Sequence, residues 1–373
     1  MTGLAAIIPA AGLSSRMGRF KPLLPLGGGT VLSRCIGAFA GTVEKRIVVT
    51  GKRADEVAAE AVSAGAMAVH NPAFEEGMFS SIQTGVRALD DSVRAFFVLP
   101  ADIPLVRPET AGRIAGAFWE ATPPVLYPVF AGKRGHPPLV SRELIPEILA
   151  HDGTGGLRAV LERHDSGALD LDVADFGTTH DLDYPQDYEL AVQVAEFEGP
   201  LESECRVLWK LHGVAERVLD HCRAVSVVAA ALAERLNARQ EGAKLDPVLV
   251  RGAALTHDIG KGTRRHEAAG AEILHLHGFH AAAEIVAVHS DLSLAPDAPT
   301  TEREVVFLAD KLVRRCDPVA LEDRYLEKIQ MFGHEPGAEE AIRGRMERAK
   351  TVLRRVDREI GCSCEALARE VLR

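Results

Sequence analysis

Two groups of residues in this sequence have the types and spacing suited to chemistry. The first surrounds a Gly/Ser-rich stretch, residues 9–26, that follows the apolar run 4–8. This stretch leaves backbone N–H groups bare, and glycine such as Gly12 permits the backbone angles needed to wrap an anion. Arg16 and Lys21 add two positive charges within ten residues of Gly12. A strand, an anion-binding loop and two cations together predict a triphosphate site.

A carboxylate follows a second apolar run. Residues 95–99 are apolar at every position, which is expected of a central strand covered on both faces, and Asp102 comes soon after them. Ligands of open α/β sheets bind at the carboxyl ends of the strands. Mg²⁺ takes one or two carboxylates together with phosphate oxygens, so Asp102 is a predicted Mg²⁺ ligand. The alternative is that Gly12 and Asp102 only form ordinary turns.

The second group lies on predicted helices in the other half of the chain. Its members are polar side chains on or beside apolar stripes of helical spacing: His221, His257, Asp258, His266, His289 and Asp310. One such residue alone reads as a buried histidine or an internal salt bridge. Six together are costly, because a buried polar group without a partner costs about 2–7 kcal/mol. Four imidazoles and two carboxylates that converge on divalent metal explain the set, and mixed N/O ligands suit Fe, Mn, Zn or Co.

The elements that must position these groups differ between the two halves. Strand and helix patterns alternate to about residue 190, which predicts an α/β domain with a mainly parallel sheet. The rest is helical nearly throughout, which predicts an all-α second domain. We expect domains at 1–197 and 205–325, followed by a C-terminal helical extension at 335–373 that packs or dimerises.

The composition limits the classes of partner and compartment. Across 373 residues the net charge is −10 and only 5% are aromatic, which argues against nucleic acid and anionic membrane as partners. Six cysteines without a framework spacing predict a reduced, cytoplasmic protein. No basic segment precedes the apolar start and no apolar run reaches about 20 residues, so we expect neither a signal peptide nor a membrane helix.

The motif A-A-G-L-S-S-R-M-G-x-x-K-x-L-L-P-L, residues 10–26, resembles the signature of the MobA-like nucleotidyltransferases, especially the molybdenum cofactor cytidylyltransferases. The resemblance implies a Rossmann-like fold and Mg²⁺-dependent transfer of a nucleotide to a phosphorylated acceptor, with release of pyrophosphate. The pair Ala10-Ala11 is similar to that of the members that use CTP. The implied acceptor is molybdopterin, and the implied protein partner is a molybdoenzyme or its maturation chaperone. The alternative acceptor is a sugar or alcohol phosphate.

Further site residues follow from the same resemblance. The segment 180–188 resembles the D-x-D-x-P-x-D-Y ending of these enzymes, in which Asp183 completes the metal site, although Asp181 is a neighbouring alternative. His136 lies in a G-H-P segment that implies a place near the acceptor. Residues 76–82 are expected to open a helix that Ser80 or Ser81 caps, and Ser81 is included among the residues predicted to bind the nucleotide.

The second half resembles the HD superfamily of metal-dependent phosphohydrolases. His221, His257-Asp258 and Asp310 match its H…HD…D core, and His266 and His289 match the extra histidines of members with two metals. The resemblance implies that Asp258 bridges the metals and that Lys261 neutralises a substrate phosphate. The substrate stays open as a phosphoester or nucleotide. The alternative is a nucleotide-sensing regulatory module that has no turnover.

Overall fold

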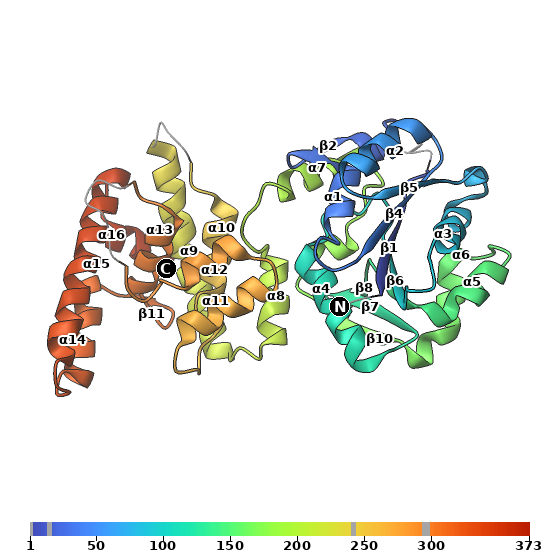
Figure 1. The fold of residues 1–373 in the computed structure, drawn as a ribbon. Helices are drawn as coiled ribbons and strands as arrows, with labels where there is room; N and C mark the ends of the chain where they lie inside the picture. Colours follow the sequence, from blue (N-terminus) through green and yellow to red (C-terminus); the bar gives the residue numbers. More distant parts are fainter. Residues whose placement is uncertain (1–2, 13–16, 240–243, 293–298) are drawn as a thin grey trace. The chain divides into compact units, whose positions relative to one another are not determined.

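The chain divides into two compact units in the computed structural model. Residues 3–12, 17–239, 244–292 and 299–373 are described. Unit 1 comprises Met1–Glu196 and unit 2 comprises Phe197–Arg373. Figure 1 shows a sheet with helices in unit 1 and an arrangement of helices in unit 2.

Unit 1 is built on an eight-stranded sheet of order β10-β7-β9-β6-β1-β4-β5, with β8 paired to β7. The strands are β1 (Leu4–Pro9), β4 (Lys45–Thr50), β5 (Met67–His70), β6 (Ala95–Val98), β7 (Val125–Phe130), β8 (Lys133–Arg134), β9 (Leu139–Ser141) and β10 (Leu169–Asp172). β1 runs parallel to β4 and β6, β4 to β5, and β7 to β10. β9 is antiparallel to both β6 and β7, and β8 is antiparallel to β7. The prediction of an α/β domain with a mainly parallel sheet is confirmed.

Helices cover both faces of this sheet, as Figure 1 shows. They are α1 (Val31–Gly37), α2 (Ala54–Ser63), α3 (Met78–Arg87), α4 (Pro108–Ala121), α5 (Ile145–Ala150), α6 (Gly156–Leu161) and α7 (Pro185–Val194). Alternate strand residues face opposite ways, so Ala6 and Ile8 pack with α1, α2 and α4 while Ala5 and Ile7 pack with α3, α5 and α6. Burial on both faces explains the continuous apolar runs of β1 and β6.

Unit 2 is helical apart from one short hairpin among its described residues. Its helices are α8 (Glu202–Leu211), α9 (Glu216–Arg239), α10 (Pro247–Thr256), α11 (His266–Leu276), α12 (His280–Val286), α13 (Glu302–Lys311), α14 (Leu321–Phe332), α15 (Ala338–Ile360) and α16 (Cys364–Val371). The hairpin joins β11 (Val313–Arg314) to β12 (Asp317–Pro318). α9 packs against α10, α13, α15 and α16, so it is the central helix. The predicted helical second domain is confirmed, with this hairpin as its departure from an all-α fold.

Two local features bear on the sites. Neither Ser80 nor Ser81 caps the helix, because α3 already begins at Met78 and Gly77 stands before it with a φ of 105°. Such a φ is open mainly to glycine, so the chain turns into the helix there and Ser81 falls within its body. None of the described helices has both the length and the apolar character needed to cross a membrane.

Candidate functional site

The first site is positioned by two neighbouring parallel strands. The N–H of Ala101 donates to the carbonyl oxygen of Pro9 at 3.0 Å, and the N–H of Ala10 donates to that of Val49 at 2.9 Å. These bonds extend the pairing of β1 with β6 and β4 beyond the strand ends. Because parallel strands end at the same edge, the glycine turn after β1 and the Asp102 turn after β6 lie side by side.

Lys21 joins two distant carboxylates at this edge. Its Nζ atom lies 3.2 Å from Oδ2 of Asp102 and 3.2 Å from Oδ1 of Asp183, which are 81 and 162 positions away in sequence. The N–H of Leu182 donates to the carbonyl oxygen of Asp102 at 2.9 Å and holds the segment of Asp183 beside it. The two carboxylates therefore converge on one centre of positive charge. Oxygen ligands of this kind fit a hard divalent cation such as Mg²⁺.

A pocket of about 280 Å³ adjoins these groups. The residues that line it and were predicted from the sequence are Ala10, Ala11, Gly12, Lys21, Ser81 and Asp102. The buried Ser81 hydroxyl accepts a hydrogen bond from Nδ2 of Asn71 at 3.0 Å, so its own proton is left to donate. Arg16, predicted to bind the phosphates, lies outside the described residues.

His136 is not part of that pocket wall, although the charge of Asp102 acts on its ring. Its backbone N–H donates to the carbonyl oxygen of Thr178 at 2.7 Å. Nδ1 of the ring is buried and has no hydrogen-bond partner among the described residues. Burial lowers the pKa of His136, although the negative charges of Asp102 and Asp181 oppose this. Asp181 itself is exposed, and the carboxylate that reaches Lys21 is that of Asp183.

The second site gathers four histidines whose rings are oriented through one nitrogen each. Nδ1 of His221 lies 2.8 Å from the carbonyl oxygen of Arg315. Nδ1 of His257 lies 2.8 Å from the carbonyl oxygen of Ala254, and Nδ1 of His289 lies 2.7 Å from that of Val286. A carbonyl oxygen only accepts, so each Nδ1 carries the proton and each Nε2 presents a lone pair. Nδ1 of the fourth ring, His266, lies 3.2 Å from Oε2 of Glu267. Metal-binding histidines are oriented in this way.

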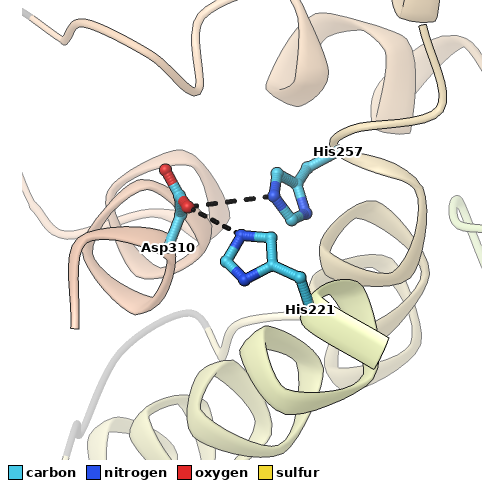
Figure 2. Close-up of side chains that lie close together, drawn as sticks. All are labelled: His221, His257 and Asp310. Atoms are coloured by element: carbon cyan, nitrogen blue, oxygen red, sulfur yellow. Dashed lines mark hydrogen bonds and ion pairs between the residues drawn. The ribbon is translucent and has the colours of Figure 1, made fainter. Parts of the chain in front are cut away.

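The Nε2 atoms of these rings point at carboxylates. Oδ1 of Asp310 lies 3.2 Å from Nε2 of His221 and 3.9 Å from Nε2 of His257, and Figure 2 shows the three side chains facing one another from separate helices or helix ends. Oδ1 of Asp258 lies 3.6 Å from Nε2 of both His266 and His289. Successive ring centroids are 5.1 to 5.4 Å apart. All six residues predicted as ligands therefore lie in one cluster.

Nitrogen lone pairs that face carboxylates repel them unless a cation lies between the two groups. The burial and the spacing of the ligand atoms indicate which kind of cation fits. His257 is fully buried, and burial lowers the pKa of its ring to about 4, so the ring is neutral at neutral pH. Its Nε2 has no hydrogen-bond partner among the described residues. The ligand atoms of His221, His257 and Asp310, and those of His257, Asp258 and His289, each lie within 4.8 Å of one another. Both groups fit a divalent metal with mixed N/O ligands.

Cations hold the two carboxylates of the cluster in their charged form. Although burial alone would raise the pKa of Asp258, its neighbours hold it far below its usual range, and among them Nζ of Lys261 lies 2.9 and 3.1 Å from the two oxygens. Burial likewise opposes ionisation of Asp310, and Lys311 at 2.6 Å and Arg324 at 3.0 Å keep its pKa well below the usual range. Charged carboxylates are the form that binds metal.

A cavity of about 870 Å³ opens on this cluster and is lined by residues that sequence reasoning missed. Arg324 and Lys328 come from α14, and Ile342 and Arg345 come from α15. Helix α15 packs against α9 and α14, as the predicted packing helix should, and it also contributes to the cavity wall. Its basic residues resemble solvent-facing charges on a charged helix, and the sequence carries no periodicity that marks them.

Comparison with known families agrees with the two folds. Residues 6–168 match the MobA-like NTP transferase domain, and residues 218–315 match the HD domain. The chain is therefore an enzyme that joins a MobA-like nucleotidyltransferase domain to an HD domain. Domains of both kinds depend on metal ions.

Individual relatives match about half of the chain or less. The molybdenum cofactor cytidylyltransferase of Escherichia coli (strain K12) is 28% identical over 189 residues, which are 50% of this chain and 95% of that protein. The bifunctional protein GlmU of Corynebacterium aurimucosum is 35% identical over 118 residues, which are 30% of this chain and 24% of that one. A solved nucleotidyl transferase from Methanothermobacter thermautotrophicus is 25% identical, with a TM-score of 0.46 over 52% of this chain and 97% of that one.

Proposed function

We propose that unit 1 transfers a cytidylyl group from CTP to a molybdopterin-type acceptor and releases pyrophosphate, and that unit 2 hydrolyses a phosphate ester or nucleotide. The transfer is supported above all by the convergence of Asp102 and Asp183 on Lys21 beside the glycine turn. The choice of cytidine is supported by the pair Ala10-Ala11 and by the name of the Escherichia coli relative. The hydrolase is supported by the six clustered ligands.

In unit 1 the backbone amides near Gly12 would bind the triphosphate, and Lys21 would neutralise the charge on its phosphates. Arg16 would add a second cation. Asp102 and Asp183 would hold Mg²⁺, and His136 would orient the acceptor. The acceptor phosphate attacks the α-phosphorus, and the bond to pyrophosphate breaks. When bound, the divalent ions of both units act as Lewis acids on phosphate oxygens.

In unit 2 the four histidines and two carboxylates would hold one or two transition metals. Asp258 would be a ligand shared between two metals, because one of its oxygens lies 3.7 Å from Nε2 of His257 and the other lies 3.6 Å from Nε2 of both His266 and His289. Lys261 would bind a substrate phosphate. Water attacks phosphorus, the bond from phosphorus to the leaving oxygen breaks, and that oxygen takes a proton released by the water. All six cysteines are free thiols, which supports work in a reducing compartment such as the cytoplasm, where a molybdoenzyme or its chaperone would accept the product.

The test is pyrophosphate release from a panel of CTP, GTP, ATP and UTP with Mg²⁺ and molybdopterin. We expect the highest kcat/KM with CTP, and a strong preference for GTP would overturn the cytidine assignment. Turnover of a sugar or alcohol phosphate in place of molybdopterin would overturn the acceptor. For unit 2, phosphate release from p-nitrophenyl phosphate and from nucleotides is measured with Mn²⁺, Fe²⁺, Zn²⁺ or Co²⁺. A chain that binds metal but hydrolyses none of them would favour a sensor role.

A further inference from the structure

The cavity beside the metal-ligand cluster is larger than one phosphate group requires. It encloses about 870 Å³, which lies in the range of about 300–1,000 Å³ of pockets that hold whole organic ligands. His221, Asp258 and Asp310 form one part of its wall. Helices α14 and α15 form another part, and both lie beyond the residues that match the HD domain.

Positively charged side chains outnumber negatively charged ones on the wall of this cavity. Eight lysines and arginines line the cavity together with five aspartates and glutamates. Two of these carboxylates, Asp258 and Asp310, belong to the metal-ligand cluster, and Glu327 forms an ion pair with Arg314. Bound metal would add further positive charge. The cavity is therefore suited to a ligand with several negative charges.

Two cationic side chains of the C-terminal helices, Lys328 and Arg345, do not bind the carboxylates of the metal-ligand cluster. Among the described residues Lys328 has no hydrogen bond or ion pair, and its Nζ lies 5.6 Å from the ring centroid of Tyr325. Arg345 is held loosely, with Nε 3.6 Å from Oδ2 of Asp291, because Arg348 already binds both oxygens of that carboxylate at 2.7 and 3.0 Å. Lys311 and Arg324 differ from these two, since both bind Asp310.

Lys328 is exposed on the cavity wall and lies near several other cations. Partial desolvation at this wall lowers the pKa of its ammonium to about 8, and the charges of Lys311 and Arg324 add to this effect, while the charge of Asp310 opposes it. A bound anion would offset the repulsion. The same wall carries two exposed apolar side chains, Met331 and Phe332, which are 63% and 47% accessible and offer contact to a planar or apolar group.

We infer that Lys328 and Arg345 form a second anion subsite beside the metal-ligand cluster, so that unit 2 takes a substrate with two or more phosphates on an organic group, such as a nucleoside diphosphate or triphosphate. This substrate class rests on the hydrolase function proposed for the same cavity. One phosphate lies at the cluster with Lys261, and the next reaches the two helices. A small monoester spans only the first of these positions.

The experiment measures binding and turnover separately in the full chain. Calorimetry of the metal-free protein compares inorganic tripolyphosphate with inorganic phosphate, and kinetics of the metal-loaded protein compares a nucleoside diphosphate with p-nitrophenyl phosphate. The variants are Lys328→Gln and Arg345→Gln. Their matched controls are Lys350→Gln and Arg343→Gln, which lie on α15 outside the cavity wall and form exposed ion pairs with Glu322 and Glu339. All four substitutions lie in unit 2. A difference in anion binding between variants and controls therefore reports on unit 2 and does not come from anion bound at unit 1.

We expect each cavity variant to weaken tripolyphosphate binding, and to raise KM for the diphosphate, by about tenfold or more, as loss of a contact to a charged group does. Phosphate binding and turnover of p-nitrophenyl phosphate should stay within about twofold, and the controls should match the parent. Unchanged tripolyphosphate binding, or an equal loss with both anions, would overturn the second subsite. If no compound is hydrolysed but the selective loss of tripolyphosphate binding appears, the subsite stands and the hydrolase proposal fails.

Discussion

Nε2 of His257 lies 3.9 Å from Oδ1 of Asp310, and no hydrogen bond joins them. Both atoms present lone pairs, because Nδ1 of His257 donates to the carbonyl oxygen of Ala254. Ligand atoms about 2.0–2.2 Å from a shared metal lie about 3.0–4.2 Å apart, so the separation fits one ion between them. We predict that His257→Ala lowers the affinity of unit 2 for Mn²⁺ or Zn²⁺ by at least about a hundredfold and abolishes its phosphatase activity.

Metal content is measured by mass spectrometry after dialysis at fixed free metal, and pyrophosphate release reports on unit 1. The matched control is His275→Ala, whose ring pairs with His280 at 2.9 Å on the exposed side of α11 and lies outside the cluster. The control should retain metal and phosphatase activity, and both variants should retain nucleotidyl transfer. A His257→Ala protein that holds as much metal as the control would exclude His257 as a ligand.

Removal of metal should destabilise the chain. Without an ion the lone pairs of His257 and Asp310 repel, and a ligand that binds only the folded state at 100 times its Kd stabilises it by about 2.7 kcal/mol. We predict that dialysis against a chelator lowers the Tm by several degrees and that added Mn²⁺ or Zn²⁺ restores it. Calorimetric scans of His257→Ala should lose most of this metal-dependent shift. A shift of the same size in that variant would place the stabilising metal elsewhere.

The layers of the fold could be predicted from the sequence, but some strand pairings could not. Apolar runs such as residues 95–98 are long enough to show a strand buried on both faces, and β6 forms there. β9 follows β7 in sequence yet inserts antiparallel between β6 and β7. Its partners are set by contacts distant in sequence, which leave no local pattern. The cap of α3 was predicted wrongly for a related reason, since the helix begins after Gly77, whose φ sets the turn, and the two serines lie inside the helix.

The ligands of unit 2 could be predicted because buried polar residues on an apolar stripe are costly and so carry a signal. His221 interrupts the stripe of α9 in this way. Lys328 and Arg345 carry no such signal, because lysine and arginine are ordinary on a solvent-facing helix surface. In unit 1, Asp102 follows a recognisable strand, whereas Asp183 could be singled out from Asp181 only by resemblance to a family.

The contact of Lys21 with Asp183 separates these two aspartates experimentally. We predict that Asp183→Asn lowers kcat for pyrophosphate release by at least about a hundredfold, because one of two carboxylates that would hold Mg²⁺ is lost. The matched control Asp181→Asn changes an exposed carboxylate two residues away and should stay within about threefold. Raising Mg²⁺ should partly restore the Asp183 variant. A larger loss of kcat in Asp181→Asn than in Asp183→Asn would assign the metal site to Asp181.

Lys21 should serve the nucleotide rather than the metal. Its ammonium contacts both Asp102 and Asp183 at 3.2 Å, so Lys21→Met leaves two carboxylates without a shared cation. Facing carboxylates then repel each other and attract Mg²⁺ more strongly, while the triphosphate loses a charged contact of about 1.5–3 kcal/mol. We predict that CTP affinity falls by about tenfold or more, as measured by calorimetry, and that Mg²⁺ affinity without nucleotide does not fall. Lys45→Met removes a partly exposed ammonium that pairs with Asp90 and should change neither. A variant that binds CTP normally but loses Mg²⁺ would show instead that Lys21 acts by holding the two carboxylates in place.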